Sequence, residues 1–266
     1  MTERAAPRLA EVPEADAAGR VAAVYEDIRR VTGVDTVALV YRVLASNPET
    51  LEAVWDDLAP NLAAPRVRDA ALTLDASLSN GVSPLVPELV TVPYVETEAT
   101  LSSFARINRL NVVGLTALLE GVAAPIAPRL VGSALPAPIG AGLPMADIGA
   151  LPLQTVALLE EMSASVAGPE RPLVIPSLFR YFAHDERLLR ALWTAVRPVV
   201  DDPSFTEGAA TLRDDAATIA ANVPYRVRPL PHGEAHDVVE RFLRTIPTMI
   251  LVGGALAAAL GVAVHR

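Results

Sequence analysis

The segment HGEAH places two histidines and a carboxylate at a spacing that could hold a metal ion. His232 and His236 are four residues apart, and Glu234 lies between them. On a helix, two histidines at this spacing lie on one face and could bind zinc. The order differs from the H-E-x-x-H motif of metalloproteases, however, and Gly233 indicates that a helix only begins here. We interpret the segment as the exposed, acid-rich start of a helix and predict no metal.

Two arginines could recognise a carboxylate. Arg42 and Arg180 lie far apart in the chain but in similar local sequences, and both could face a shared central pocket and bind a carboxylate bidentately. Alternatively, each arginine contacts terminal carbonyls of a helix or a surface aspartate, the commoner role for an arginine near a helix end. We favour this second, structural interpretation.

Composition excludes several other chemistries. The chain has no cysteine, which excludes disulfides, thiol catalysis and cysteine-ligated zinc. The net charge is −9, and no run of basic residues is present to neutralise a phosphate backbone, so we expect no nucleic-acid partner. The first residues contain no apolar stretch of the kind that secretory signals carry. We therefore expect a cytoplasmic protein.

The elements that position these residues occur twice in the chain. The two tryptophans, Trp55 and Trp193, differ by 138 in residue number, and so do Arg42 and Arg180. This repeat offset joins further pairs of identical residues: Ala45 and Ala183, Leu51 and Leu189, Pro60 and Pro198, Pro93 and Pro231, and Phe104 and Phe242. One constant offset over so long a stretch indicates a tandem repeat without net insertion.

Each copy has helical periodicity. Leu51, Val54, Trp55 and Leu58 follow the i, i+3, i+4, i+7 pattern of one helix face. Asn47 before Pro48 is typical of a helix N-cap followed by proline at the first helical position, and Asp185 stands at the equivalent place in the second copy. No run with strand periodicity is long enough to matter, so the predicted fold is all-α.

The two copies predict an intramolecular pseudo-dimer. We assign residues 17–124 to the first helical repeat, 125–152 to a linker and 153–266 to the second repeat. The linker is dense in proline and glycine, which interrupt helices. Two such copies are expected to pack about a pseudo-twofold axis. Whether the whole chain also forms a homodimer stays open.

The C-terminal stretch from Ile246 to Val264 carries no charge and is long enough to cross a bilayer. It is rich in glycine and alanine, which favour membrane insertion less than leucine or isoleucine does. We predict a helix buried within the protein, with a membrane anchor as the alternative.

The segment VYEDIRRVTGVDTVALVYRVLASNPETLEAVWDDLAP, residues 24–60, resembles the opening of the group I α-haloacid dehalogenases. The similarity rests on Tyr25-Glu26-Asp27-Ile28-Arg29, on Arg42-Val43-Leu44-Ala45, and on Pro48 and Trp55. The resemblance implies a tandem helical repeat without metal or cofactor. It also implies hydrolysis of the carbon–halogen bond of short 2-halocarboxylic acids by directly activated water.

The resemblance also implies where the site lies. Asn111, in the segment INRLN, takes the place of the asparagine that holds the attacking water. Ser177-Leu178-Phe179 matches the family's Ser-Asp-Phe, so Leu178 stands where the family has its catalytic aspartate. Thr36 and Leu39 take positions of the substrate pocket, and Ser177 is expected to contact the substrate.

Two functions follow from this pattern. One is a dehalogenase-type hydrolase acting on a small organic acid, in which Asp35 or Asp185 would have to replace the missing base. We interpret both aspartates instead as helix N-caps. The alternative is a non-catalytic protein that binds a small acid in an apolar pocket between the repeats.

Overall fold

The computed structural model describes residues 9–74, 82, 84–85, 93–127, 135–167 and 174–264. Helices are the regular elements of these residues, and an isolated antiparallel bridge between Val122 and Val227 is the one β-type contact among them. The predicted all-α fold is therefore confirmed.

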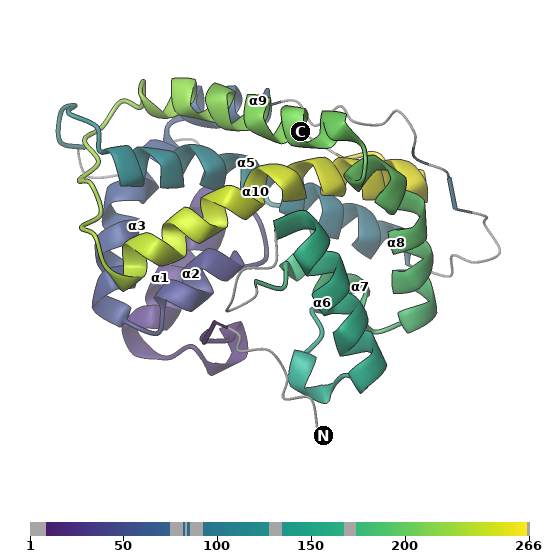
Figure 1. The fold of residues 1–266 in the computed structure, drawn as a ribbon. Coiled ribbons are helices and arrows are strands. Elements are labelled where there is room, and N and C mark those ends of the chain that lie inside the picture. The colour runs from purple at the N-terminus through teal and green to yellow at the C-terminus, as the bar shows by residue number, and fades with distance from the viewer. Residues whose placement is uncertain are drawn as a thin grey trace.

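Among the described residues, the first half of the chain forms five α-helices and the second half forms five more; Figure 1 shows their arrangement. In Figure 1, α1, α2 and α3 lie on one side, α6, α7 and α8 on the other, and α10 crosses the middle. The elements of the first half are the short 3-10 helix η1 (Glu14–Asp16), α1 (Gly19–Thr32), α2 (Leu39–Leu44), α3 (Pro48–Ala63), α4 (Pro65–Leu72) and α5 (Tyr94–Glu120). Those of the second half are the 3-10 helix η3 (Ile148–Ala150), α6 (Leu153–Ala167), α7 (Ser177–Phe182), α8 (Glu186–Val200), α9 (Pro203–Ala220) and α10 (Glu234–Leu260).

The order of helices in the two halves agrees with the sequence offset. Helix α7 starts and ends at the repeat offset from α2 (39 to 177, 44 to 182), and α8 starts at the same offset from α3 (48 to 186). The described part of the segment 125–152 contains no α-helix, while residues 128–134 of the linker lie outside the described residues. Superposition of the halves about a twofold axis, and the exact repeat boundaries, stay predictions.

Each tryptophan packs against an aromatic ring of the short helix that precedes its own helix. The Trp55 ring lies 5.5 Å from the Tyr41 ring with an interplanar angle of 80°. The Trp193 ring lies 6.5 Å from the Phe179 ring at 68°. Both are edge-to-face contacts, the geometry that aromatic pairs prefer. Because Tyr41 and Phe179 are also related by the repeat offset, the same contact fixes α2 on α3 and α7 on α8.

The predicted caps of α3 and α8 are present. The Asn47 side chain accepts a hydrogen bond from the Thr50 amide at 3.1 Å, and Asp185 accepts from the Arg187 and Leu188 amides. The predicted cap at Asp35 is wrong. Helix α2 follows Ala38, which makes no side-chain cap, and Asp35 lies three residues too early to reach the first turn.

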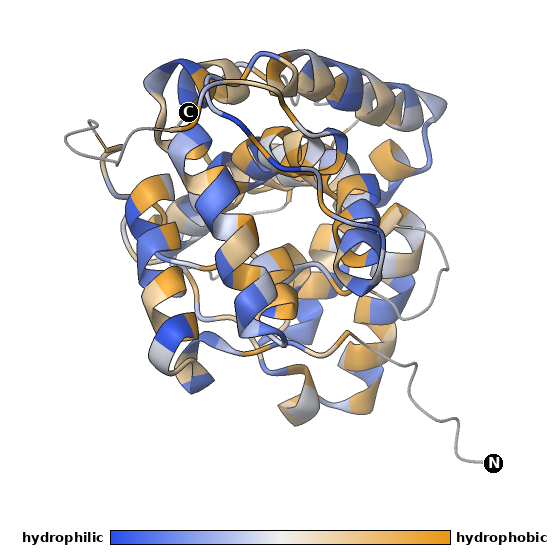
Figure 2. Ribbon diagram, turned by 90° about the vertical axis from the view of Figure 1, so that its left-hand side faces the viewer, coloured by the Kyte–Doolittle hydropathy of each residue, from blue (hydrophilic) through white to orange (hydrophobic). Residues whose placement is uncertain are grey.

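Helix α10 is the one described helix long and apolar enough to cross a membrane. In its most apolar stretch of 18 residues, 67% of the residues are buried inside the protein. The helix packs most extensively along α5, and a Cβ at Gly253 would lie 3.4 Å from the Phe104 ring. It begins at Glu234 and ends before Gly261, so the predicted continuation to Val264 is wrong. Figure 2 shows apolar and polar residues separated on the faces of the surrounding helices.

Candidate functional site

A cavity of about 280 Å³ lies between α5, α10 and the starts of α2 and α7. Val37, Leu143, Met145 and Phe242 are among its apolar lining residues, and the described lining contains no lysine, arginine or histidine. Its polar lining residues are Glu14, Asp35, Thr36, Thr100, Ser103, Asn108, Asn111, Ser177, Tyr181 and Thr245. The cavity is small, mostly apolar and supplied with a few polar groups, as small-ligand sites are.

Many lining residues come in pairs related by the repeat offset, so the cavity lies where equivalent positions of the two halves meet. Thr36, Leu39, Asn111 and Ser177, four of the residues predicted for the site, are in the lining. The pairs are Thr36 and Val174, Ala38 and Pro176, Leu39 and Ser177, Phe104 and Phe242, Ile107 and Thr245, Asn108 and Ile246, and Asn111 and Met249.

Asn111 presents an unused hydrogen-bond donor in this lining. Its side chain is 1% exposed, and its Oδ1 accepts a hydrogen bond from the Tyr41 hydroxyl at 2.9 Å. Its Nδ2 has no partner among the described residues. Burial raises the pKa of Tyr41 far above its usual value, so the phenol keeps its proton and must donate it. This donation fixes the orientation of the amide and leaves its buried Nδ2 unpaired.

Asn108, one turn earlier on α5, also lines the cavity but is already engaged. Its Nδ2 donates to the Phe104 carbonyl at 2.8 Å. The two asparagines therefore differ in their hydrogen bonding although they share a helix and a cavity. The sequence analysis did not identify Tyr41 as a residue of the site. A signal was available, because Tyr41 and Asn111 are both replaced at the repeat offset, by Phe179 and Met249.

Leu178 lies behind the cavity wall. Its side chain is fully buried and is not part of the lining. One of its methyl groups would lie 3.8 Å from a Cβ at Gly253 of α10, so the side chain is directed into the packing between α7 and α10. The position at which the sequence resemblance places the family's base therefore offers no polar group to the cavity.

Two carboxylates lie at the cavity. Glu14 Oε1 accepts from the Val37 amide at 3.0 Å and the Thr36 hydroxyl at 3.2 Å, and its Oε2 pairs with Arg29 at 2.6 Å. Asp35 is exposed. Glu14 is thus ion-paired with Arg29 and held in place by hydrogen bonds, whereas Asp35 faces solvent. Glu14 was not foreseen because it lies in the N-terminal segment, outside any helical pattern.

Two hydroxyl groups of the cavity lining lie in contact beside Glu14. The hydroxyls of Thr36 and Tyr181 lie 2.9 Å apart. Burial raises the pKa of Tyr181, which therefore stays neutral over the physiological range. Thr36 belongs to the first half of the chain and Tyr181 to α7, so this contact joins the two halves at the cavity.

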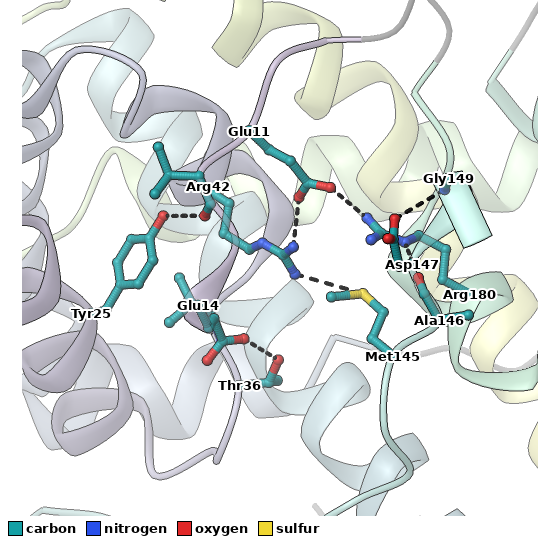
Figure 3. A network of polar contacts seen from close by, with 12 residues as sticks. Glu11, Glu14, Tyr25, Thr36, Arg42, Met145, Ala146, Asp147, Gly149 and Arg180 are labelled. Carbon is teal, nitrogen blue, oxygen red and sulfur yellow. Dashed lines mark hydrogen bonds and ion pairs between the residues drawn. The ribbon is translucent and has the colours of Figure 1, made fainter. Parts of the chain in front are cut away.

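Both arginines meet a carboxylate, which was the less favoured of the two interpretations, and the chain itself supplies it. Arg42 Nη2 lies 2.8 Å from Glu11 Oε2, and Arg180 Nη1 lies 2.8 Å from Glu11 Oε1 (Figure 3). Both arginines are buried, at 3% and 5% exposure. Neither belongs to the cavity lining, although Met145, which contacts Arg42 Nη1 through its sulfur at 3.7 Å, does.

The histidine-rich segment begins α10, as predicted. The helix starts at Glu234, and the rings of His232 and His236 lie 4.4 Å apart. Ligand atoms of His236, Asp237 and Glu240 approach within 4.8 Å of one another, with both carboxylate residues exposed. Exposed acidic groups commonly gather without a metal, and the absence of a metal stays a prediction.

The sequence matches no known family profile and no curated protein. Among solved structures, the chain is similar to "The complex structure of D-2-haloacid dehalogenase with L-LA", with a TM-score of 0.77 and 15% identity over 95% of this chain and 96% of that one. It is also similar to "The complex structure of D-2-haloacid dehalogenase mutant with D-2-CPA", with a TM-score of 0.75 and 19% identity over 96% and 97%. The resemblance found in the sequence therefore extends over the whole architecture, and the chain has the fold of the D-2-haloacid dehalogenases.

Proposed function

We propose that the cavity binds a short 2-substituted carboxylic acid and that the chain does not hydrolyse a carbon–halogen bond by the route that the resemblance implies. The observation that carries the proposal is the free Nδ2 of Asn111 in a small apolar cavity. A buried donor without a partner costs about 1–3 kcal/mol. A ligand that supplies an acceptor oxygen removes this cost.

The size and chemistry of the cavity support a small acid. A volume of about 280 Å³ is at the lower end for ligand sites, which suits a ligand of a few heavy atoms. The apolar walls suit a short alkyl or halogen substituent, while Asn111 and the Ser177 hydroxyl can donate to a carboxylate. Solved structures of the same fold are described with L-LA and with D-2-CPA.

The absence of dehalogenation is inferred from Leu178 and Glu14. Leucine cannot take a proton from water, and this side chain lies outside the cavity lining. Glu14 already accepts hydrogen bonds on both of its oxygens. Loss of a general base typically lowers a rate by about 10²–10⁴.

The position of Asp35 supports a second candidate function, a hydrolase in which Asp35 acts as the general base in place of the residue at position 178. This carboxylate lines the cavity, and no hydrogen bond or ion pair joins it to another described residue. Asp185, the other aspartate considered as a substitute base, caps α8 and is not in the lining. A hydrolytic reaction in this cavity therefore depends on Asp35.

The two functions are separated by measuring binding and halide release on the same protein. The unfolding temperature is followed with D- and L-2-chloropropionate, lactate, propionate and the neutral propionamide, and halide is measured by ion chromatography. We expect saturable stabilisation by the acids, weaker stabilisation by the amide, which supplies one acceptor oxygen instead of two, and no halide above the enzyme-free control. Halide release that disappears in Asp35→Asn would establish the hydrolase instead. Absence of stabilisation by every acid would contradict the binding function.

A further inference from the structure

We propose that Arg42 and Arg180 form a binding site for a small monocarboxylate anion and that the chain occupies this site with its own Glu11. The site is distinct from the cavity, since neither arginine belongs to the cavity lining. It therefore extends beyond the proposed function, and its test does not require that the cavity bind an acid.

The geometry is that of one carboxylate held between two guanidinium groups. Each oxygen of Glu11 lies 2.8 Å from a nitrogen of a different arginine (Figure 3). The arginines occupy equivalent positions of the two halves, one on α2 and one on α7. The Arg180 contact is a hydrogen bond, whereas the Arg42 contact is an ion pair in which Glu11 Oε2 accepts no hydrogen bond.

The charges of the site require an anion. Two guanidinium groups are buried together, and Glu11 is the one described carboxylate within 4.0 Å of either. A buried charge that loses its partner is strongly destabilising. Arg42 also keeps spare donors, because its buried Nε has no partner and its Nη1 meets only the weak acceptor Met145 Sδ. The site thus offers more donors and more positive charge than Glu11 can satisfy.

Glu11 behaves as a tethered ligand. It lies before both predicted repeats, on an N-terminal segment that is further held by two hydrogen bonds. The Val12 amide donates to the Arg42 carbonyl at 2.9 Å, and the Tyr25 hydroxyl donates to the Val12 carbonyl at 2.9 Å. A short tether gives such a ligand an effective concentration in the millimolar range or above. A free acid therefore competes poorly with Glu11 in the wild-type protein but binds readily once that carboxylate is removed.

Occupancy of this site is coupled to the cavity. The segment that carries Glu11 also carries Glu14, which lines the cavity and accepts the Val37 amide. On the other side of the site, the Ala146 amide donates to the Arg180 backbone carbonyl at 3.2 Å. This hydrogen bond holds the segment that contains Met145, which lines the cavity. Release of Glu11 is thus expected to loosen the wall formed by Glu14.

The test is chemical rescue of Glu11→Ala. Sodium chloride is exchanged for sodium formate at constant ionic strength, and the unfolding midpoint is followed. We expect a low midpoint in chloride and a saturable rise of about 2–6 °C at about 100 mM formate. Wild type and Glu52→Ala, which removes one of the two carboxylates that pair with Arg20, are expected to shift by less than about 1 °C over the same range.

Two results would overturn the site. One is a Glu11→Ala midpoint that does not change with formate, and the other is an equal rise in wild type and Glu52→Ala. If Glu11→Ala does not fold in chloride, its refolding yield from urea in formate replaces the midpoint, and equal yields in formate and chloride contradict the proposal. Glu11→Gln provides a further control, because its amide still fills the site and formate should give no rescue.

Discussion

The hydroxyl of Tyr41 donates to Oδ1 of Asn111 at 2.9 Å, and this hydrogen bond fixes the orientation of the amide. The phenol is fully buried and needs an acceptor, so it holds the amide oxygen and leaves the buried Nδ2 without a partner among the described residues. In the second half of the chain the equivalent residues are Phe179 and Met249, which cannot form this bond. This hydrogen bond is therefore confined to one half of the cavity, although the lining comes from both halves.

Tyr41→Phe is expected to weaken binding of 2-chloropropionate by roughly 3- to 10-fold. The substitution removes the donor that orients Asn111 but leaves the ring packing on Trp55. Calorimetric titration measures the affinity, and urea unfolding measures stability. Tyr225→Phe is the matched control, because Tyr225 does not line the cavity and lies outside the N-terminal segment. Equal loss of affinity in both variants would contradict the orienting role.

Leu178→Asp is expected to destabilise the protein by about 3–5 kcal/mol without producing halide. The side chain is buried against α10 and is not in the lining, so a carboxylate placed there replaces apolar packing and does not meet the ligand. Urea unfolding and ion chromatography test the two parts. A folded variant that releases halide would show that this position does reach the cavity.

Asp185→Ala is expected to cost about 1 kcal/mol of stability, because two amides of α8 lose their acceptor. Asp35→Ala is expected to change stability by less than about 0.5 kcal/mol, since Asp35 is exposed and does not cap α2. Denaturant midpoints of both variants check this contrast. A cost as large for Asp35 as for Asp185 would restore the capping role predicted for it.

Stability is expected to fall as the pH rises above about 10. Burial raises the pKa of Tyr25, Tyr41 and Tyr181, so these phenols stay protonated when tyrosines of the unfolded chain ionise. The unfolded state then releases protons that the folded state retains, and folding becomes less favourable. Below the unfolded pKa the phenols are neutral in both states and contribute no slope. Urea midpoints measured between pH 8 and about 11 should fall more steeply for wild type than for Tyr41→Phe.

The sequence predicted what depends on local pattern. The caps at Asn47 and Asp185 follow from side chains that reach amides two or three residues away. The repeat offset read from Trp55 and Trp193 also relates α7 to α2 and the start of α8 to that of α3. The aliphatic composition and the helical periodicity were enough to give the all-α class.

What the sequence missed depends on distant contacts or on which face of a short helix a residue occupies. Tyr41 and Asn111 are 70 residues apart, and Glu11 meets an arginine 169 residues away. In the six-residue helix α7, consecutive side chains turn by about 100°, so Ser177 lines the cavity while Leu178 is buried behind it. A positional match to a family motif does not fix that direction.

The central claim is that the unpartnered amide of Asn111 binds a small carboxylic acid. The most direct measurement is calorimetric titration of 2-chloropropionate into wild type, Asn111→Leu and Asn108→Leu. The two variants make the same change on one helix and in one cavity, but only the first removes the free donor. We expect affinity to fall about 10- to 100-fold in Asn111→Leu and to stay within about threefold of wild type in Asn108→Leu. Undiminished binding by Asn111→Leu would contradict the account.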